Sequence, residues 1–229
     1  MRKIFVVACM VLLIGSLAAY AQNYPPPAGA ILDLNGQTIP HGTAQQYTVN
    51  FAAALSSTDI TFAFREDPAY ISFSDVSVTD LTNPSGNLIV DGDFSGGTVG
   101  SNVAAGWSYA NVYGASASGV VETGSYCYGG LSAYCWYDGA VGAYDAINQS
   151  IATTIGDTYQ ISFWAVDNGG LTNWSDLSTG SGDNGADILA YAQAGLPPPG
   201  TVPEPSSIAL LTTGLAALAG AVRRKMARN

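Results

Sequence analysis

The chain has 229 residues, and its formal net charge at neutral pH is −10. The charge is uneven, because the segment from Gln22 to Thr201 holds 16 acids and a single base, Arg65, for a net charge of −15. Such a segment repels phosphate backbones and lacks the basic, aromatic-studded stripe that nucleic-acid binding requires. Nucleic acid is therefore excluded as a partner, which leaves cations, neutral polar ligands and sugars.

The first 21 residues have the three parts of a secretory signal. Arg2 and Lys3 precede an apolar run at 4–17, and the Ala-Tyr-Ala tripeptide that ends at Ala21 places small residues where signal peptidase requires them. We therefore predict that residues 1–21 are a signal peptide, removed by signal peptidase after Ala21. An uncleaved N-terminal anchor is the alternative, which the short apolar run disfavours.

The cysteines predict one disulfide. Cys9 lies inside the signal and leaves with it, so the mature chain keeps Cys127 and Cys135. Exported proteins fold in an oxidising compartment, and an even number of cysteines remains. A bridge across so short a loop stabilises by about 2 to 3 kcal/mol. Two thiols and one histidine are too few for a zinc site.

A Pro-rich lead-in at 22–30 is followed by strand signals. From residue 31 to 196, apolar residues alternate with polar ones at the period of half-buried strands, and no window keeps a helical period over three turns. A change of phase between Phe73 and Val76 predicts a bulge near Ser74-Asp75. The predicted strands centre on residues 47–51, 60–64, 71–78, 88–90, 120–122, 146–151, 159–163 and 188–192.

Clusters of Gly, Asn, Asp and Ser separate these strands, for example at 83–86 and 179–185. They are the residues of turns and loops. Many short strands with closely spaced turn signals are typical of antiparallel sandwiches. We therefore predict an all-β ectodomain, a β-sandwich over residues 31–196.

The C-terminus has three parts in a fixed order. A linker at 197–205 ends in Pro203-Glu204-Pro205, an apolar run fills 206–222, and a basic tail at 223–229 begins with Arg223-Arg224-Lys225. Seventeen helical residues extend about 25 Å, just short of a hydrocarbon core. The run therefore predicts one transmembrane helix, with the basic tail in the cytoplasm and the ectodomain outside.

This tail resembles the PEP-CTERM sorting signal of Gram-negative bacteria. The resemblance covers about the last 27 residues, and it implies handling by an exosortase and association with exopolysaccharide or biofilm matrix. We expect the protein to be held at the inner membrane before sorting, and then to reach the cell surface or the medium. A plain C-terminal anchor is the alternative, but it requires neither the Pro-Glu-Pro nor so short an apolar run.

Two ectodomain stretches resemble modules with a carbohydrate-binding, galactose-binding-like jelly roll. Asn87 to Phe94, with Gly106-Trp107 downstream, is similar to the opening strand of such domains. In that family the opening strand leads to a glutamine-bearing strand, here 147–151, and then to a Tyr-x-x-Ser-Phe-Trp strand, here 159–164. Residues 62–78 resemble the closing strands. The resemblance implies a jelly-roll β-sandwich.

The order of these stretches is unusual, because closing-type strands at 31–82 precede opening-type strands at 87–196. Either the first part is the remnant of a separate module, or the two parts complete one permuted sandwich. Some fifty residues bury too little surface for a core of their own. We therefore expect one shared sandwich.

Catalysis is not expected from these residues. His41 is the only histidine and stands in a turn context, and no Gly-x-Ser-x-Gly elbow is present. A glycosidase needs two carboxylates across a sugar cleft, one of them desolvated. Most acids here lie near glycines in evident loops, where water screens them. We predict a protein that is not an enzyme, with a secreted polysaccharide hydrolase as the alternative.

Structural calcium is one hypothesis for the acids, because Ca²⁺ prefers oxygen ligands in Gly-rich loops. Asp91 and Asp93 are the first candidates, with Asp67 and Asp75 next. Related jelly rolls often have a glutamate after the phenylalanine of the opening motif, where this chain has Ser95. A calcium-dependent adhesion module is therefore an alternative and not the first hypothesis.

Sugar binding is the other hypothesis, because Trp and Tyr faces stack on pyranose rings beside polar groups. Alternatively, most of these rings cover the core. We expect a ligand face first at Tyr134 to Tyr137, next to the predicted disulfide. The aromatic residues outside the clear core strands are Trp107, Tyr128, Tyr134, Trp136, Tyr137 and Trp174.

Overall fold

The computed structural model describes residues 26–35, 37, 39–169 and 185–198. The predicted signal peptide, Trp174 and the tail from residue 199 lie outside the described residues. Residues Asn23–Gly200 form one compact unit. Within the described ranges no helix has the length and hydropathy to span a membrane, and the predicted transmembrane run lies beyond them.

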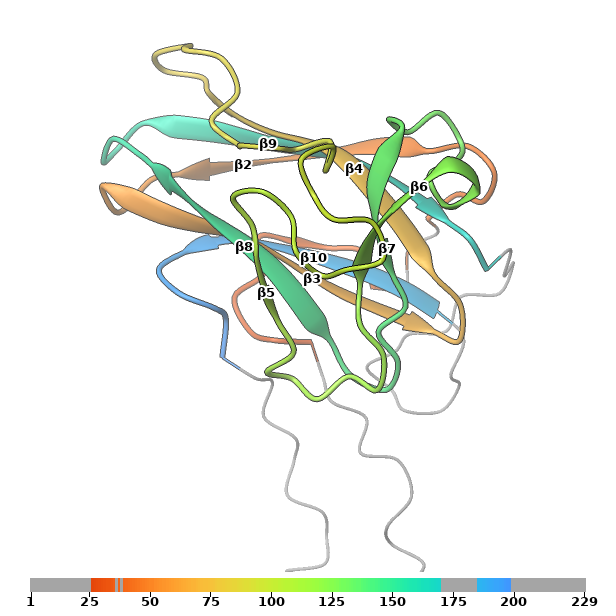
Figure 1. Cartoon of the computed structure of the whole chain (residues 1–229). Coiled ribbons are helices and arrows are strands. Elements are labelled where there is room, and N and C mark those ends of the chain that lie inside the picture. Colours follow the sequence, from red (N-terminus) through yellow and green to blue (C-terminus); the bar gives the residue numbers. More distant parts are fainter. Residues whose placement is uncertain (1–25, 36, 38, 170–184, 199–229) are drawn as a thin grey trace, which may run out of the picture. The chain divides into compact units, whose positions relative to one another are not determined.

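Two antiparallel five-stranded sheets form the described fold, and Figure 1 shows them as two layers. The first sheet has the order β1-β10-β3-β8-β5, and the second has the order β2-β9-β4-β7-β6. The predicted all-β sandwich is confirmed. The elements are β1 (Leu32–Asp33), β2 (Gln45–Ala52), β3 (Ser57–Asp67), β4 (Ile71–Asp80), β5 (Ser108–Ala110), β6 (Val120–Thr123), the short 3-10 helix η2 (Gly124–Tyr126), β7 (Tyr134–Asp138), β8 (Asp145–Ala152), β9 (Thr158–Asp167) and β10 (Gly185–Gln193).

Apart from the short strands β5 and β6, the strands pair in a nested order. The first strand, β1, pairs with the last, β10, and likewise β2 pairs with β9, β3 with β8, and β4 with β7. Further pairings of β3 with β10 and of β4 with β9 join these pairs into the two sheets. Each pair therefore brings an early strand to a late one.

Residues 31–82 and 87–196 share one core as a result. Strands β1 to β4 come from the first part, and the strands they pair with come from the second. Between the sheets, Phe163 of β9 packs against Phe62 of β3 and Phe73 of β4, with ring centroids 5.3 and 5.0 Å apart. The expected single sandwich, rather than two separate modules, is what the strands form.

Alternation along each strand decides which side chains enter this core. Phe62 and Phe64 of β3 and Phe163 of β9 face inward and are fully buried. Two of these rings pack on Phe73 of β4, at centroid distances of 4.8 and 5.1 Å. Side chains at even positions of β3 and odd positions of β9 thus meet between the sheets, as the period of two requires.

The predicted bulge in β4 is confirmed. The register between β4 and β9 shifts between Ser74 and Ser77, and Asp75 has a φ of 57°. One extra residue at this point lets Phe73 and Val76 both face the core, although their spacing is odd.

The predicted strand at 88–90 is wrong, because only Asn87 forms a bridge there, to Thr79. Strand β7 pairs with β4 only over Ile71–Phe73, so beyond the bulge the edge of β4 has a loop and not a strand beside it. The side chain of Asn87 takes the place of a strand. Its Oδ1 accepts the Val78 N–H at 2.9 Å, and its Nδ2 donates to the Val76 carbonyl at 3.2 Å. A carboxamide thus satisfies backbone groups that a strand would otherwise pair.

A second carboxamide fixes the same segment from the other sheet. Gln149 of β8 accepts the Val90 N–H at 2.7 Å and donates to the Val90 carbonyl at 3.0 Å. Trp107 adds a bond from its indole N–H to the Asp91 carbonyl at 3.1 Å. The motif that resembles an opening strand is therefore a loop held by side chains.

Strands β1, β5 and β7 were not predicted. The first two span only two and three residues, too few for a periodic signal. Strand β7 reads Tyr-Cys-Trp-Tyr-Asp, which has aromatic residues on both faces and so shows no alternation of apolar and polar residues.

Replacing Gln149 by Met, which keeps the length but neither hydrogen bond, should lower the free energy of unfolding by about 1 to 3 kcal/mol. The cost arises because both polar groups of Val90 lose their partner. Urea unfolding followed by circular dichroism measures it. Gln160→Met on the outer face of β9 is the matched control and should change stability by less than half as much; equal effects would contradict the anchoring role.

Candidate functional site

An aromatic hollow lies at one end of the second sheet, on its outer face. It encloses about 400 Å³. We call it the tyrosine cleft. Tyr70 stacks flat on Tyr137 with centroids 4.6 Å apart, and Tyr126 meets the Tyr137 ring edge-on at 5.0 Å. Tyr70 and Tyr126 are each more than two-fifths exposed. The residues that line the cleft are His41, Ser125, Tyr126, Tyr128, Tyr137 and Asn168.

A disulfide positions the cleft. Cys127 and Cys135 are bonded, with their Cα atoms 5.5 Å apart. Cys127 stands between Tyr126 and Tyr128, whereas Cys135 lies on β7 two residues before Tyr137. The bridge therefore fixes the tyrosine-bearing turn against the strand that supplies the third ring.

Backbone carbonyls orient the polar groups of the cleft. The Tyr128 hydroxyl donates to the Asp167 carbonyl at 2.5 Å, and His41 Nδ1 lies 2.9 Å from the same oxygen. Ser72 donates to the Tyr126 carbonyl and receives a bond from the Asn168 amide at 2.6 Å. The cleft walls are thus held by hydrogen bonds from β4 and from the end of β9.

The cleft presents neutral groups. Burial raises the pKa of Tyr137 to about 12, and it also raises the pKa of Tyr128. Both phenols therefore keep their protons at neutral pH and can donate hydrogen bonds. No carboxylate is among the lining residues. Aromatic faces beside neutral donors and acceptors suit an uncharged polar ligand.

The structure divides the predicted ligand-binding aromatics. Tyr137 lines the cleft, and Tyr134 is half-buried against the core. Trp107 and Trp136 are only 8% and 0% exposed, so the prediction that they form a ligand face is wrong. The physical reason is that both indoles face inward and complete the core. Trp174 lies outside the described residues.

Sequence reasoning missed Tyr70, Tyr126, His41 and Asn168 as parts of one site. Tyr126 and Tyr128 flank Cys127 of the predicted disulfide, and this position could have indicated that they belong to the same aromatic site as Tyr137. His41, Tyr70 and Asn168 come from three distant parts of the chain, and only the pairing of β4 with β9 and the bridge of His41 to Asp167 bring them together.

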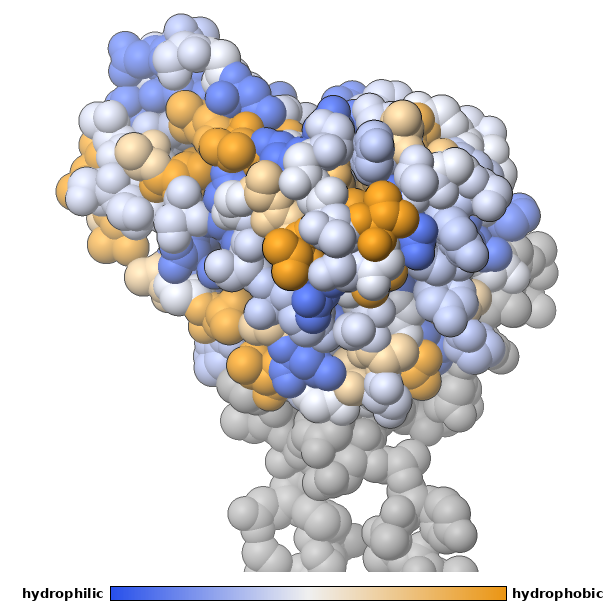
Figure 2. All heavy atoms as spheres, viewed as in Figure 1, coloured by the Kyte–Doolittle hydropathy of each residue, from blue (hydrophilic) through white to orange (hydrophobic). Residues whose placement is uncertain are grey.

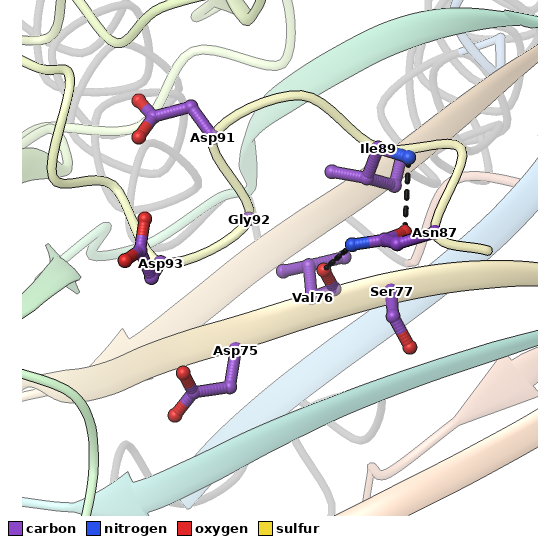
Figure 3. A pocket seen from close by; sticks show the side chains of 8 residues that line it. All are labelled: Asp75, Val76, Ser77, Asn87, Ile89, Asp91, Gly92 and Asp93. Atoms are coloured by element: carbon purple, nitrogen blue, oxygen red, sulfur yellow. Dashed lines mark hydrogen bonds between the residues drawn. The ribbon is translucent and has the colours of Figure 1, made fainter.

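A second hollow, of about 420 Å³, contains three of the four predicted calcium candidates, Asp75, Asp91 and Asp93 (Figure 3). Asp91 accepts the N–H groups of Gly96 and Ala105 at 2.7 and 3.2 Å. Asp93 accepts from Ser95, the residue that replaces the expected glutamate. The hollow is lined by Asp75, Val76, Ser77, Asn87, Ile89, Asp91, Gly92 and Asp93.

The other acids considered for calcium also have partners. Asp75 accepts two bonds from Ser132, and Asp67 pairs with Arg65 at 2.6 Å. Across the described ranges, no group of three or more His, Cys, Asp or Glu residues is arranged to hold a metal ion. Calcium binding stays a prediction, and the contacts seen are those of carboxylates that shape loops.

The surface itself has no broad apolar face in the view of Figure 2, where hydrophobic residues form small groups between hydrophilic ones. Small groups of hydrophobic residues at the surface are common in folded proteins. On this side of the sandwich, a ligand would meet polar groups first.

Residues 201–225 match the PEP-CTERM protein-sorting motif. The motif implies an exported protein that is anchored in the membrane for sorting by an exosortase. No curated protein and no solved structure matches the chain. A match to a known motif therefore supports the sorting tail, whereas the role of the ectodomain has to be inferred from its own structure.

Replacing Cys127 and Cys135 together by Ser should lower the free energy of unfolding by about 2 to 3 kcal/mol, because the unfolded chain regains the entropy of an open loop. The cleft should also lose order. Denaturant unfolding gives the first effect, and limited proteolysis within residues 124–132 gives the second. Intact protection of that turn in the variant would contradict the disulfide's positioning role.

Proposed function

We propose that this chain is a non-catalytic envelope or matrix protein whose ectodomain binds an uncharged glycan in the tyrosine cleft. The observation that supports this most is the aromatic group of Tyr137 and Tyr126 in a hollow without lining carboxylates, with the exposed ring of Tyr70 stacked on Tyr137 beside it. Rings of this kind stack on the apolar face of a pyranose, while the phenol, imidazole and amide groups bond its hydroxyls.

The charge of the ectodomain favours a neutral polysaccharide over an anionic one. A segment with a net charge of −15 repels anionic chains at long range. An exopolysaccharide of neutral sugars meets no such barrier. It also agrees with the PEP-CTERM tail, which resembles those of matrix-associated proteins.

The nested strand pairing supports a jelly roll, the finer fold that the ectodomain motifs resemble. Pairing first with last, second with second-last and so inward is the folded double Greek key of that architecture. The fold by itself does not assign a ligand, so the proposal rests on the cleft.

The absence of catalysis is part of the proposal. A glycosidase acid must reach the glycosidic oxygen. The carboxyls with raised pKa values, such as Glu66 and Asp145, are fully buried, and no acid lines the tyrosine cleft. A secreted hydrolase is the competing function, and it would require a carboxylate within reach of the bound sugar.

Removal of one ring tests the cleft. Tyr137→Ala should weaken binding to any glycan found on an array by at least about tenfold, because the central ring of the stack is lost. Titration calorimetry with the best glycan measures the change. Trp164→Ala removes another exposed aromatic ring of the same sheet, outside the cleft, and should leave affinity unchanged.

Two results would count against the proposed function. One is undiminished binding by the Tyr137 variant, which would place the ligand elsewhere. The other is cleavage of the bound glycan by the wild-type protein, with loss of cleavage on a single carboxylate substitution. That result would establish the hydrolase.

Deletion of Pro203 to Asn229 tests whether the tail holds the protein at the membrane for sorting. The ectodomain should be released into the periplasm or medium with unchanged circular dichroism, because Asn23–Gly200 is a compact unit. Removing only Met226 to Asn229 leaves the matched motif intact and should keep the protein membrane-associated. Cell fractionation distinguishes the two variants, and loss of β structure in the longer deletion would mean that the tail belongs to the fold.

A further inference from the structure

Four acidic side chains lie inside one end of the sandwich. Each occupies an inward-facing position at a strand end. Glu66 lies two residues after the core residue Phe64 on β3, and Asp145 is the register partner of Phe64. Asp138 and Asp167 are both register partners of the core residue Ile71. All four are 0% exposed. We call them the acidic layer, and its members are Glu66 of β3, Asp138 of β7, Asp145 of β8 and Asp167 of β9.

Within the layer, Glu66 and Asp145 have buried carboxyl oxygens that no hydrogen bond satisfies. Asp138 receives the Trp136 indole N–H and the Ala140 N–H at 2.8 and 2.9 Å. Glu66 is the extreme case, since both of its carboxyl oxygens are buried without a well-formed hydrogen bond, and the nearby Ala69 N–H only partly offsets the rise in its pKa. A buried carboxylate without partners is so costly that a proton or another cation must neutralise it.

The described bases do not supply that neutralisation. Arg65 is the only lysine or arginine of the described ranges, and it pairs with Asp67 on the other face of β3 at 2.6 Å. His41 contacts the backbone carbonyl of Asp167. The remaining titratable neighbour is Tyr109 of β5, a phenol beside Asp145.

Protons fit the contacts that are present. Asp138 and Asp145 hydrogen-bond to each other, which requires one of the two carboxyls to carry a proton. Burial, and then the charges of Asp167, Asp67 and Asp138, raises the pKa of Glu66 to about 9. Burial and the charge of Asp138 raise the pKa of Asp145 to about 9 as well.

The layer is joined to the tyrosine cleft through the end of β9. The Asp167 side chain lies in the layer close to Glu66, and a side chain on Gly169 would contact both carboxyls. The Asp167 carbonyl accepts the Tyr128 hydroxyl on the outer face, and its N–H donates to the Pro40 carbonyl next to His41. Asn168 itself lines the cleft. Movement of this strand end would therefore move three cleft residues.

We propose that the acidic layer is a protonated latch that regulates the tyrosine cleft. While Glu66 and Asp145 keep their protons, the end of β9 stays closed on β3, and the cleft is formed. When these two ionise, they repel each other and the neighbouring carboxyls of Asp138 and Asp167, and this end of the sandwich opens. The identity of the regulated ligand rests on the proposed function, whereas the opening of this end with pH does not.

The sign of the pH dependence follows from the raised pKa values. The closed end holds protons that the opened end, with ordinary carboxyl pKa values near about 4, has lost. Closure is therefore most stable below that pH and weakens continuously up to about pH 9, where Glu66 and Asp145 ionise in place. For each proton that the closed end holds and the opened end has lost, the equilibrium shifts toward opening by about tenfold per unit of rising pH over this range.

Hydrogen exchange measured by mass spectrometry tests the latch without any glycan. The full chain, purified in detergent, is compared at pH 5, 7 and 9, with each rate divided by its intrinsic rate. Protection of peptides covering 65–72 and 165–169 should fall by at least about tenfold per pH unit. Peptides at the opposite end, around 53–57 and 152–158, should change less.

Glu66→Gln should reduce this slope by about one proton, or about tenfold per pH unit, because an amide cannot ionise. Glu122→Gln on β6 is the matched control and should keep the wild-type slope. If Glu66→Gln does not fold, Asp145→Asn serves as the second variant with the same expected reduction.

Two outcomes would overturn the latch. A pH-independent protection at the layer, or an unchanged slope in both layer variants, would mean that the shared protons do not hold this end closed. Added calcium that restores protection at pH 9 in the wild type but not in Glu66→Gln would make the layer a metal site instead. Loss of glycan binding in Tyr137→Ala alone would not bear on either result.

Discussion

The two-residue period of β7 is the constraint on which both the cleft and the core depend. Over five residues this strand sends Trp136 and Asp138 between the sheets, and Cys135 and Tyr137 to the outer face. The inward residues complete the aromatic core and the acidic layer, whereas the outward ones hold the disulfide and the central ring of the cleft. A slip of one residue would exchange the two sets and bury a phenol where a carboxyl now shares a proton. The nested pairing fixes that register, because β7 is the neighbour of β4 and β4 is held by β9 on its other side.

Carboxamides and a disulfide complete what the strands leave open. Asn87 supplies hydrogen bonds along the free edge of β4, and Gln149 holds the following loop from the opposite sheet. Such contacts explain why a motif that resembles an opening strand is a loop in this chain. The disulfide has a similar role on the outer face, where it joins the turn at 124–131 to β7. Side-chain bonds thus hold in place the segments that strand pairing leaves free.

The arrangement combines an acidic exterior, a neutral cleft and protonated acids inside. The formal net charge of −15 over residues 22–201, which the buried protons reduce only in part, repels anionic polymers, whereas the cleft presents aromatic rings, hydroxyls, an imidazole and an amide. The interior carboxyls differ from the surface ones because water cannot screen them, so they keep protons at a pH at which the surface acids are ionised. The end of β9 belongs to the cleft and to the acidic layer alike, which makes it the natural point of coupling between ligand and pH.

The sequence by itself determined the sorting signal and the all-β architecture. The Pro-Glu-Pro tail was readable because sorting signals are local in the chain, and the sandwich was readable because alternation is local in each strand. The bulge at Asp75 followed from the same alternation. Tertiary structure alone decided which aromatics reach the outer face: Trp136 and Tyr137 are adjacent large aromatic residues, and only the register with β4 buries one fully and leaves the other in the cleft. It also decided that Glu66, Asp138, Asp145 and Asp167 meet, because they are distant in sequence and converge only where four strand ends from two sheets face one another.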